Sequence, residues 1–262
     1  TNDTWEYDGS NWLLRTPVGN APAARSHHTL LFDAQLGEVA LLGGSTSAGT
    51  QANDHWKWNG TRWQLVSTLP DKPPPRHFAA LVSEPGAQGV VMFGGYQNSQ
   101  HLGDTWRWDG TMWSQLSASG PAPRRSAMLF RMQNSIYLFG GQLQDLPSVF
   151  AGETWRQNGN AWTQLNPPNS PTPRKEAGVA YHAATNRVVL FGGFDGTYLG
   201  DTWLFDGNTW TQHILSTTPL PRSAPAMTYD PVRTRAVLFG GATNFAQYDD
   251  TWQWTGSQWQ AL

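Results

Sequence analysis

Hydrophobic and polar positions divide the chain into short segments that have the period of β-strands. Residues 90–93 (VVMF) are all apolar, which is typical of a strand buried on both faces. Residues 104–108 (DTWRW) and 113–116 (WSQL) alternate aromatic with polar side chains, as a half-buried strand does. Residues 78–82 (FAALV) form a further short apolar run. Because no stretch longer than a turn follows the helical period, the pattern predicts an all-β protein.

One aromatic segment of this kind is repeated along the whole chain. The sequence DTWRWDGTMW at residues 104–113 has five counterparts, and their leading Trp residues are 48–51 positions apart. All 15 Trp residues fall within these six copies. Asp-Gly or Asn-Gly stands between the two strands of five copies, which predicts tight hairpins because both residues tolerate positive φ. The copies begin at Asp3, Asp54, Asp104, Glu153, Asp201 and Asp250.

A second repeated element separates these copies and occurs five times. It consists of a Pro-rich stretch ending in Arg, a strand-like run, a short turn, and an apolar strand ending in Gly-Gly. The Arg residues are Arg25, Arg76, Arg124, Arg174 and Arg222. The diglycines are 43–44, 94–95, 140–141, 192–193 and 240–241, and four of them follow Phe.

Together these motifs resemble the kelch repeat. Their order is Pro-Arg, strand, Phe-Gly-Gly, loop, Asp-Thr-Trp, strand, Gly and Trp, and it extends over the whole chain. The resemblance implies four-stranded antiparallel blades, with strands a to d, arranged around a central channel as a β-propeller. We therefore expect residues 1–262 to form a single kelch-type β-propeller domain.

The numbers of the two repeated elements differ by one. Six c–d hairpins accompany only five a–b hairpins, because the chain opens with a c–d unit at residues 4–14. We expect five full four-stranded blades plus a surplus two-stranded hairpin. The alternatives are six blades with one incomplete, and an a–b hairpin that comes from another chain or from residues outside this sequence. An uncovered hairpin edge invites strand addition, so self-association through the terminal hairpins is a further expectation.

Composition and charge narrow the choice of partner. The net charge is −2 without long runs of either sign, which argues against nucleic acid or an acidic membrane surface as partner. No apolar stretch approaches the length of about 20 residues that a membrane span needs. Cys is absent, which excludes disulfides, thiolate metal sites and a thiol nucleophile. Low charge, no Cys, a start at Thr1 without initiator Met, and abundant Thr, Ser, Asn and Gly predict an extracellular or periplasmic protein.

The strand order brings the b–c and d–a connections to one face of each blade. The b–c connections, residues 45–53, 96–103, 142–152, 194–200 and 242–249, differ from one another, and the d–a connections such as 65–75 and 165–173 are rich in Pro. Variable loops on a constant scaffold are typical of a binding face, although each aromatic side chain could instead fold back onto its own blade. The candidate ligand-binding residues on this face are Tyr96, His101, Phe150, Phe194, Tyr198, Phe245 and Tyr248.

The start of strand a offers a second candidate site, at the mouth of the channel. Its guanidinium groups could bind an anion, but the Asp or Glu opening strand c lies on the same face, so Arg–carboxylate pairing is the alternative. Adjacent His27 and His28 point to opposite faces of a strand, and His27 with His77 is at most a weak pair of ligands. We expect no metal and no cofactor. The candidate residues are Arg25, His27, Arg76, His77, Arg124, Arg174, Glu176 and Arg222.

Enzymes with a similar fold require catalytic residues that this sequence lacks or matches only loosely. Copper chemistry of the galactose-oxidase kind requires a Tyr cross-linked to Cys, which is absent. Iron-binding specifier proteins use Glu, Asp and His at four-residue spacing, and no such run occurs. Sialic-acid mutarotases of the kelch class use channel residues that include Arg and Glu, which Arg174 and Glu176 match only loosely.

The expected function is therefore a non-catalytic binding or assembly scaffold. Its variable b–c and d–a loops would contact a protein partner. A glycan-binding, lectin-like propeller is the alternative, because the loops are rich in aromatic and amide side chains; their dissimilarity argues against identical sugar sites. A sugar epimerase similar to the sialic-acid mutarotases is the second alternative.

Overall fold

The computed structural model describes residues 2–33, 37–66, 72–84, 89–116 and 120–262. The chain divides into two compact units, Thr1–Ala118 and Ser119–Leu262. The described residues form five four-stranded antiparallel sheets, and their one helix is the single 3-10 turn η1 (Ala183–Thr185). We call these sheets blades 1 to 5 and name their strands a to d in chain order. The predicted all-β class is confirmed.

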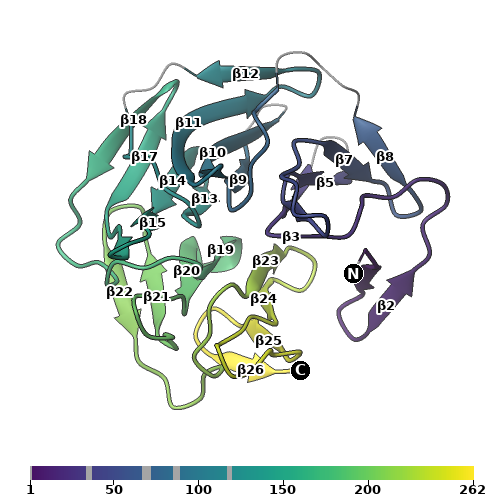
Figure 1. The fold of residues 1–262 in the computed structure, drawn as a ribbon. Helices are drawn as coiled ribbons and strands as arrows, with labels where there is room; N and C mark the ends of the chain where they lie inside the picture. Colours follow the sequence, from purple (N-terminus) through teal and green to yellow (C-terminus); the bar gives the residue numbers. More distant parts are fainter. Residues whose placement is uncertain (1, 34–36, 67–71, 85–88, 117–119) are drawn as a thin grey trace. The chain divides into compact units, whose positions relative to one another are not determined.

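The first unit contains a two-stranded hairpin followed by blades 1 and 2 (Figure 1). The hairpin consists of β1 (Thr4–Tyr7) and β2 (Trp12–Arg15). Blade 1 consists of β4 (Thr29–Asp33), β5 (Glu38–Leu42), β7 (His55–Trp58) and β8 (Trp63–Val66). Blade 2 consists of β9 (Ala80–Ser83), β10 (Val90–Gln97), β11 (Gln100–Trp108) and β12 (Trp113–Leu116). A short ladder pairs β3 (Arg25–Ser26) with β6 (Ser45–Thr46).

The second unit contains blades 3, 4 and 5. Blade 3 consists of β13 (Met128–Met132), β14 (Ser135–Phe139), β17 (Thr154–Asn158) and β18 (Ala161–Leu165). Blade 4 consists of β19 (Gly178–His182), β20 (Arg187–Phe191), β21 (Thr202–Phe205) and β22 (Trp210–His213). Blade 5 consists of β23 (Ala226–Asp230), β24 (Arg235–Phe239), β25 (Thr251–Trp254) and β26 (Trp259–Ala261). The b–c connection of blade 3 forms its own ladder, β15 (Gln142–Gln144) with β16 (Val149–Phe150).

The expected count of five full blades and one surplus hairpin is confirmed, and two local expectations in blade 2 are corrected. Strand a begins at Ala80 instead of Phe78, because Phe78 has a φ of 58°, which extended backbone does not allow. Residues 96–103 are not a loop: they extend β10 and β11 beyond a bulge between Phe93 and Gly95. Of the expected d–a connection 65–75, residues 67–71 lie outside the described part of the chain.

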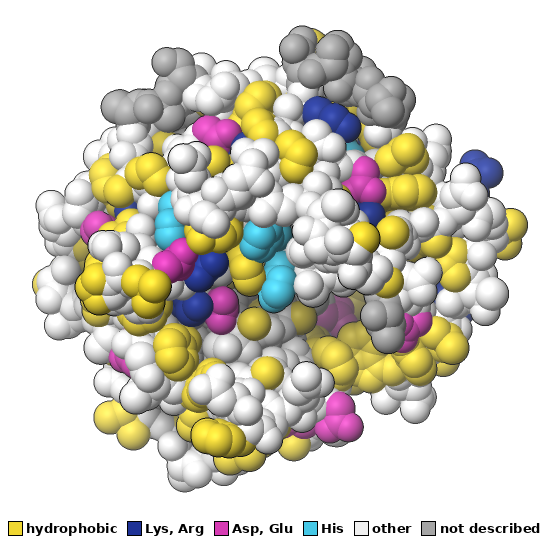
Figure 2. Space-filling model, in the orientation of Figure 1, with side chains coloured by type: hydrophobic (Ala, Val, Ile, Leu, Met, Phe, Trp, Pro, Cys, Tyr) yellow, Lys and Arg dark blue, Asp and Glu magenta, His cyan; other side chains and the backbone are white. Residues whose placement is uncertain are grey.

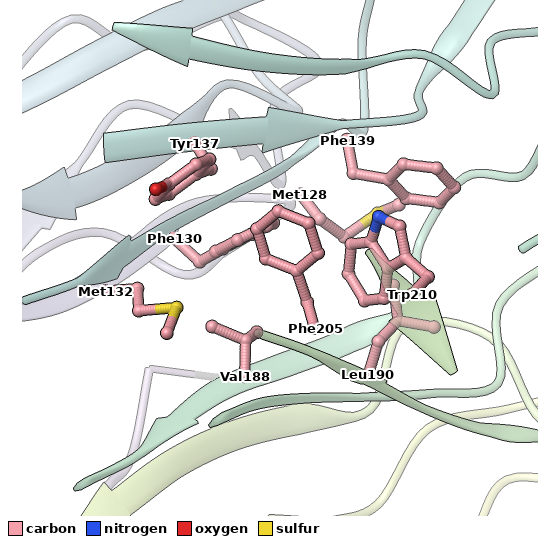
Figure 3. Close-up of a cluster of buried hydrophobic side chains, with 9 residues drawn as sticks. All are labelled: Met128, Phe130, Met132, Tyr137, Phe139, Val188, Leu190, Phe205 and Trp210. Carbon is pink, nitrogen blue, oxygen red and sulfur yellow. The ribbon is translucent and has the colours of Figure 1, made fainter. Parts of the chain in front are cut away.

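The core of each unit lies between neighbouring blades. Figure 3 shows this core between blades 3 and 4, where Phe130 of β13 lies beside Phe205 and Trp210 of blade 4. The rings of Phe130 and Trp210 meet edge to face, with centroids 6.0 Å apart and an angle of 81° between planes, a geometry that aromatic pairs favour. In the first unit, Leu42 of blade 1 and Leu81 of blade 2 belong to one such cluster. Within each unit, the alternating side chains of the strands therefore pack neighbouring blades against one another.

A repeated hydrogen bond joins the Trp that begins strand d of one blade to the Thr on strand c of the preceding blade. Nε1 of Trp210 donates to Oγ1 of Thr154 at 3.0 Å, and Nε1 of Trp259 donates to Thr202 at the same distance. Nε1 of Trp63 in blade 1 donates to Thr4 of β1 at 2.9 Å. The surplus hairpin β1–β2 therefore contacts blade 1 in the same way that strands c and d of one blade contact the following blade.

The diglycines allow a close approach of neighbouring blades. Gly192 and Gly193 have φ values of 68° and 103°, and the N–H of Gly193 donates to the carbonyl of Arg222 at 2.9 Å. A Cβ on Gly192 would lie 2.7 Å from that same carbonyl oxygen. Positive φ and this contact together require glycine.

Candidate functional site

Each Arg before strand a binds the carboxylate that opens strand c of its own blade. Nη1 and Nη2 of Arg76 donate to Oδ1 and Oδ2 of Asp104 at 2.6 and 2.8 Å, and Nη1 also donates to the carbonyl of Gly94 at 2.9 Å. The same bidentate pairing joins Arg25 to Asp54, Arg174 to Asp201 and Arg222 to Asp250. The structure thus places these Arg residues in intrablade ion pairs, the alternative considered for them at the channel mouth.

Three of these carboxylates, those of Asp54, Asp104 and Asp250, have a lowered pKa. Burial pushes the pKa of Asp104 upward, but the hydrogen bonds from Arg76 and Trp106 and the charge of Arg76 outweigh it, so the pKa is lowered. For Asp250, the hydrogen bond from Arg222 has the largest effect and also lowers the pKa. Arg25, Arg76 and Arg222 therefore each have a charged partner at neutral pH.

Blade 3 departs from this arrangement because Glu153 replaces Asp. Only Nη1 of Arg124 reaches the carboxylate, at 3.0 Å from Oε2, whereas four other blades show bidentate pairs. Nη2 of Arg124 and Nε1 of Trp155 are buried without a hydrogen-bond partner among the described residues. In blade 4 the corresponding Trp203 donates to Asp201 at 2.7 Å. One additional methylene group thus breaks two of the repeated hydrogen bonds.

The second residue after each Arg has left-handed backbone geometry. These residues are His27, Phe78, Ser126, Glu176 and Ala224, with φ values of 52–58°. In the second unit, the backbone N–H of Glu176 donates to the backbone carbonyl of Ser126 at 3.2 Å. The backbone N–H of Ala224 donates to the backbone carbonyl of Glu176 at 2.7 Å. In the first unit, the backbone N–H of Phe78 donates to the backbone carbonyl of His27 at 3.2 Å. Within each unit, successive blades are therefore joined just before their innermost strands.

In the first unit, histidine and aromatic side chains gather near these positions. The rings of His27 and His77 are 6.1 Å apart, His77 lies 5.6 Å from Tyr96, and Tyr96 lies 5.0 Å from His101. Figure 2 shows histidine side chains gathered on the drawn face. In the described part of the chain, no group of three or more His, Cys, Asp or Glu residues is arranged to hold a metal ion. The adjacent cavity, lined in part by His27 and His77, measures about 20 Å³, which is room for about one water molecule.

In the second unit, a charged cluster lies on the b–c side of blades 3 and 4. Arg125 approaches Asp145 at 2.7 Å and also donates to Oε1 of Gln142. Nζ of Lys175 donates to that same Gln142 oxygen at 2.9 Å and lies 3.5 Å from Glu176. One amide oxygen thus orients two cations whose side chains are each 18% exposed.

An aromatic surface borders this charged cluster. The rings of Phe150 and Phe194 meet edge to face 6.0 Å apart, and Phe194 lies 5.1 Å from Tyr198. Nζ of Lys175 is 5.8 Å from the centre of the Phe194 ring, within cation–π distance. The hydroxyl of Tyr198 donates to Oδ1 of Asn244 in blade 5 at 2.6 Å. We call Arg125, Lys175, Phe150, Phe194 and Tyr198 the loop-face cluster.

The sequence candidates are distributed over several environments. Phe150, Phe194 and Tyr198 lie in the loop-face cluster, while Tyr96, His101, His27 and His77 group in the first unit. Phe245 is 98% exposed. Tyr248 stacks on the guanidinium of Arg222 at 4.0 Å, so it covers an ion pair of its own blade. These placements leave the binding role of the candidates a prediction.

Sequence reasoning missed Arg125, Lys175 and Gln142 as members of this cluster. Arg125 and Lys175 directly follow the paired Arg124 and Arg174, and a side chain next to a buried one on extended backbone points the other way. That alternation was a usable signal for the two cations. The position of Gln142, immediately after a diglycine, carried no such signal.

Comparison with known proteins identifies the repeat. The family model described as KLHDC2/KLHL20/DRC7 Kelch-repeats domain matches residues 1–166 and 127–261. No curated protein matches the chain. No helix among the described residues is long and apolar enough to cross a membrane.

Proposed function

The chain belongs to the kelch-repeat family, and from that premise we propose that it is a protein-binding scaffold whose loop-face cluster contacts a partner peptide segment. Kelch propellers are typically protein-interaction scaffolds, and the five sheets are the blades of such a propeller. The fold alone does not select a ligand, because one fold hosts many functions. The chemistry of the cluster supplies the reason for the choice.

The observation that carries the proposal is the contact of Lys175 with the ring of Phe194, which packs against Phe150 of the neighbouring b–c connection. Lys175 and Arg125 share the amide oxygen of Gln142, so two cationic side chains are held close together beside the carboxylates of Asp145 and Glu176. Phe194 and Phe150 supply apolar surface immediately beside them. Aromatic and Arg side chains are enriched where binding energy concentrates in protein interfaces. A peptide segment with an acidic and an aromatic side chain fits this chemistry.

The test is selection of linear peptides from a displayed library against the immobilised protein. We expect enrichment of peptides that contain acidic and aromatic residues. Lys175→Glu should weaken their binding by at least about tenfold, because it removes an attractive charge and adds a repulsive one. Arg131→Glu is the matched control, since Arg131 is at the a–b end of β13 and bonds the carbonyl of Gln133. Peptides that bind both variants equally would contradict the proposal.

The glycan alternative is favoured by a different feature of the same surface. The Tyr198 hydroxyl bonded to Asn244, beside exposed Phe245, combines a ring and an amide as sugar sites do. Binding on a glycan array, with no peptide enriched, would select this alternative. The sugar-epimerase alternative loses one support, because Arg174 is 0% exposed and bound to Asp201. Nuclear magnetic resonance of N-acetylneuraminic acid anomers tests it directly.

Two expectations rest on the sequence alone. Self-association through the terminal hairpins and an extracellular or periplasmic location remain predictions. Light scattering over a range of concentrations tests the first of them, and localisation of the tagged protein in its source cells tests the second.

A further inference from the structure

Blade 1 has a cleft along β8, the outermost strand of that blade (Figure 1). The cleft is lined by residues 18–20, which lead from the β1–β2 hairpin toward blade 1, by Trp56 of β7, and by residues 62–65 of β8 and the turn before it. All of these residues belong to the first unit. The volume of the cleft is about 450 Å³, within the range of about 300–1,000 Å³ that is usual for small-molecule sites. The cleft therefore has room for a ligand.

The two Trp side chains that line the cleft have their polar atoms already bound. Nε1 of Trp56 donates to Oδ2 of Asp54 at 2.7 Å. Nε1 of Trp63 donates to Oγ1 of Thr4 at 2.9 Å. Each of these two Trp residues is 9% exposed. Their rings therefore present carbon surface to the cleft and no free N–H group, which favours an apolar part of a ligand against them.

Leu65 extends this apolar lining at a repeat position that is polar in three other blades. It lies opposite Trp56 in the ladder between β7 and β8. The residues opposite the equivalent Trp in blades 2, 3 and 4 are Gln115, Gln164 and Gln212. Leu65 is 44% exposed, and Val18, which also lines the cleft, is 72% exposed. The repeat does not require leucine at this position, so the exposed apolar surface of Leu65 is specific to the cleft of blade 1.

The polar lining of the cleft carries one unpaired positive charge. The backbone N–H of Arg62 donates to Oδ1 of Asn59 at 3.0 Å, which holds the turn between β7 and β8. The guanidinium of Arg62 is exposed and has no hydrogen-bond or ion-pair partner among the described residues. The amide side chains of Asn20 and Gln64 line the same cleft. A carboxylate is the group that a guanidinium binds most strongly, and the amides can donate to it as well.

We propose that this cleft binds a small carboxylic acid that carries a hydrophobic ring. The ring packs against Trp56, Leu65 and Val18, and the carboxylate accepts hydrogen bonds from the guanidinium of Arg62. A neutral sugar fits this lining less well, because it would place hydroxyl groups against carbon surface and leave Arg62 without a counter-charge. The site shares no residue with the loop-face cluster, so it does not depend on the function proposed above.

The probe is para-trifluoromethylphenylacetate, and its binding to the intact protein is measured by fluorine nuclear magnetic resonance. We expect saturable binding with a dissociation constant of about 1 mM or lower, as is usual for a ligand of this size. The neutral amide of the same compound keeps the ring but lacks the charge, so it should bind about fivefold more weakly. Glucuronate keeps the carboxylate on a hydroxylated ring, and it should bind at least about tenfold more weakly because it loses the apolar contact.

Two substitutions test whether the probe binds in this cleft. Arg62→Gln should weaken binding of the acid about fivefold and leave binding of the amide unchanged, because it removes only the charge. Leu65→Gln should weaken binding of both compounds by about threefold or more, because it removes apolar contact. Leu14→Gln is the matched control: Leu14 is the equivalent residue on β2, opposite Trp5, and it is 57% exposed but does not line the cleft.

Both substitutions should leave the fold intact, as an unchanged melting temperature would show. Gln already occupies the register of Leu65 in three blades, and the guanidinium of Arg62 has no partner to lose among the described residues. The proposal is overturned if the acid does not bind saturably, or if the amide or glucuronate binds as tightly as the acid. It is also overturned if Leu65→Gln binds the probe as well as Leu14→Gln does, because the probe would then bind elsewhere.

Discussion

The single Glu among the strand-c carboxylates gives a quantitative test of the repeated ion pair. Replacing Glu153 with Asp gives blade 3 the residue found in the other four blades. In the other four blades the Asp accepts hydrogen bonds from both terminal guanidinium nitrogens of the Arg and from the indole of the Trp two positions later. The shorter side chain should therefore satisfy Nη2 of Arg124 and Nε1 of Trp155, which now have no partner among the described residues.

The magnitude follows from these two donors. A buried donor left without a partner costs about 1–3 kcal/mol, and hydrogen bonds to charged groups contribute about 1.5–3 kcal/mol. The carboxylate of Glu153 is 35% exposed, so water already weakens the interaction and reduces the gain. We expect Glu153→Asp to stabilise the protein by about 1–2 kcal/mol, which corresponds to roughly 2–6 °C in melting temperature for a chain of this size.

Thermal and urea unfolding of the purified variant measure this gain. The reciprocal change, Asp201→Glu, serves as the matched control and should destabilise blade 4 by a similar amount, because it repeats the defect of blade 3. If Glu153→Asp is neutral or destabilising while Asp201→Glu costs nothing, the two hydrogen bonds do not contribute as argued here.

Two further predictions concern backbone strain and pH. Ala224 is exposed and has a φ of 52°, a backbone region that costs an L-residue about 1–2 kcal/mol. After the backbone entropy of glycine is subtracted, Ala224→Gly should stabilise the protein by about 0.5 kcal/mol. An unchanged or lower urea midpoint would refute this. Burial, aided by nearby positive charge, lowers the pKa of His28 below its ordinary value of 6.5, and burial likewise lowers the pKa of His182. Because unfolded histidine takes up its proton at higher pH than these two, stability should be full above about pH 6.5 and decrease as the pH falls below it. Urea unfolding at pH 7.5 and 5.5 measures this decrease, and His28→Ala should make it smaller.

Much of the fold could be predicted because it repeats. The leading Trp residues, the Asp-Gly turns and the diglycines recur at one spacing, and each repeat encodes its strands by a local alternation of side chains. The candidate site could be predicted only in part. Phe150, Phe194 and Tyr198 were expected on one face, but their contact with Lys175 depends on how blade 3 meets blade 4.

The sequence by itself determined the all-β class, the number of full blades and the surplus hairpin, because local periodicity and repeat count are properties of the linear chain. Only the tertiary structure decided which polar groups meet. It placed Arg76 against Asp104, 28 positions away, and left Leu30 exposed where Leu81 is buried. Burial and ion pairing depend on the neighbour that a strand receives, and two strands of similar sequence can receive different neighbours.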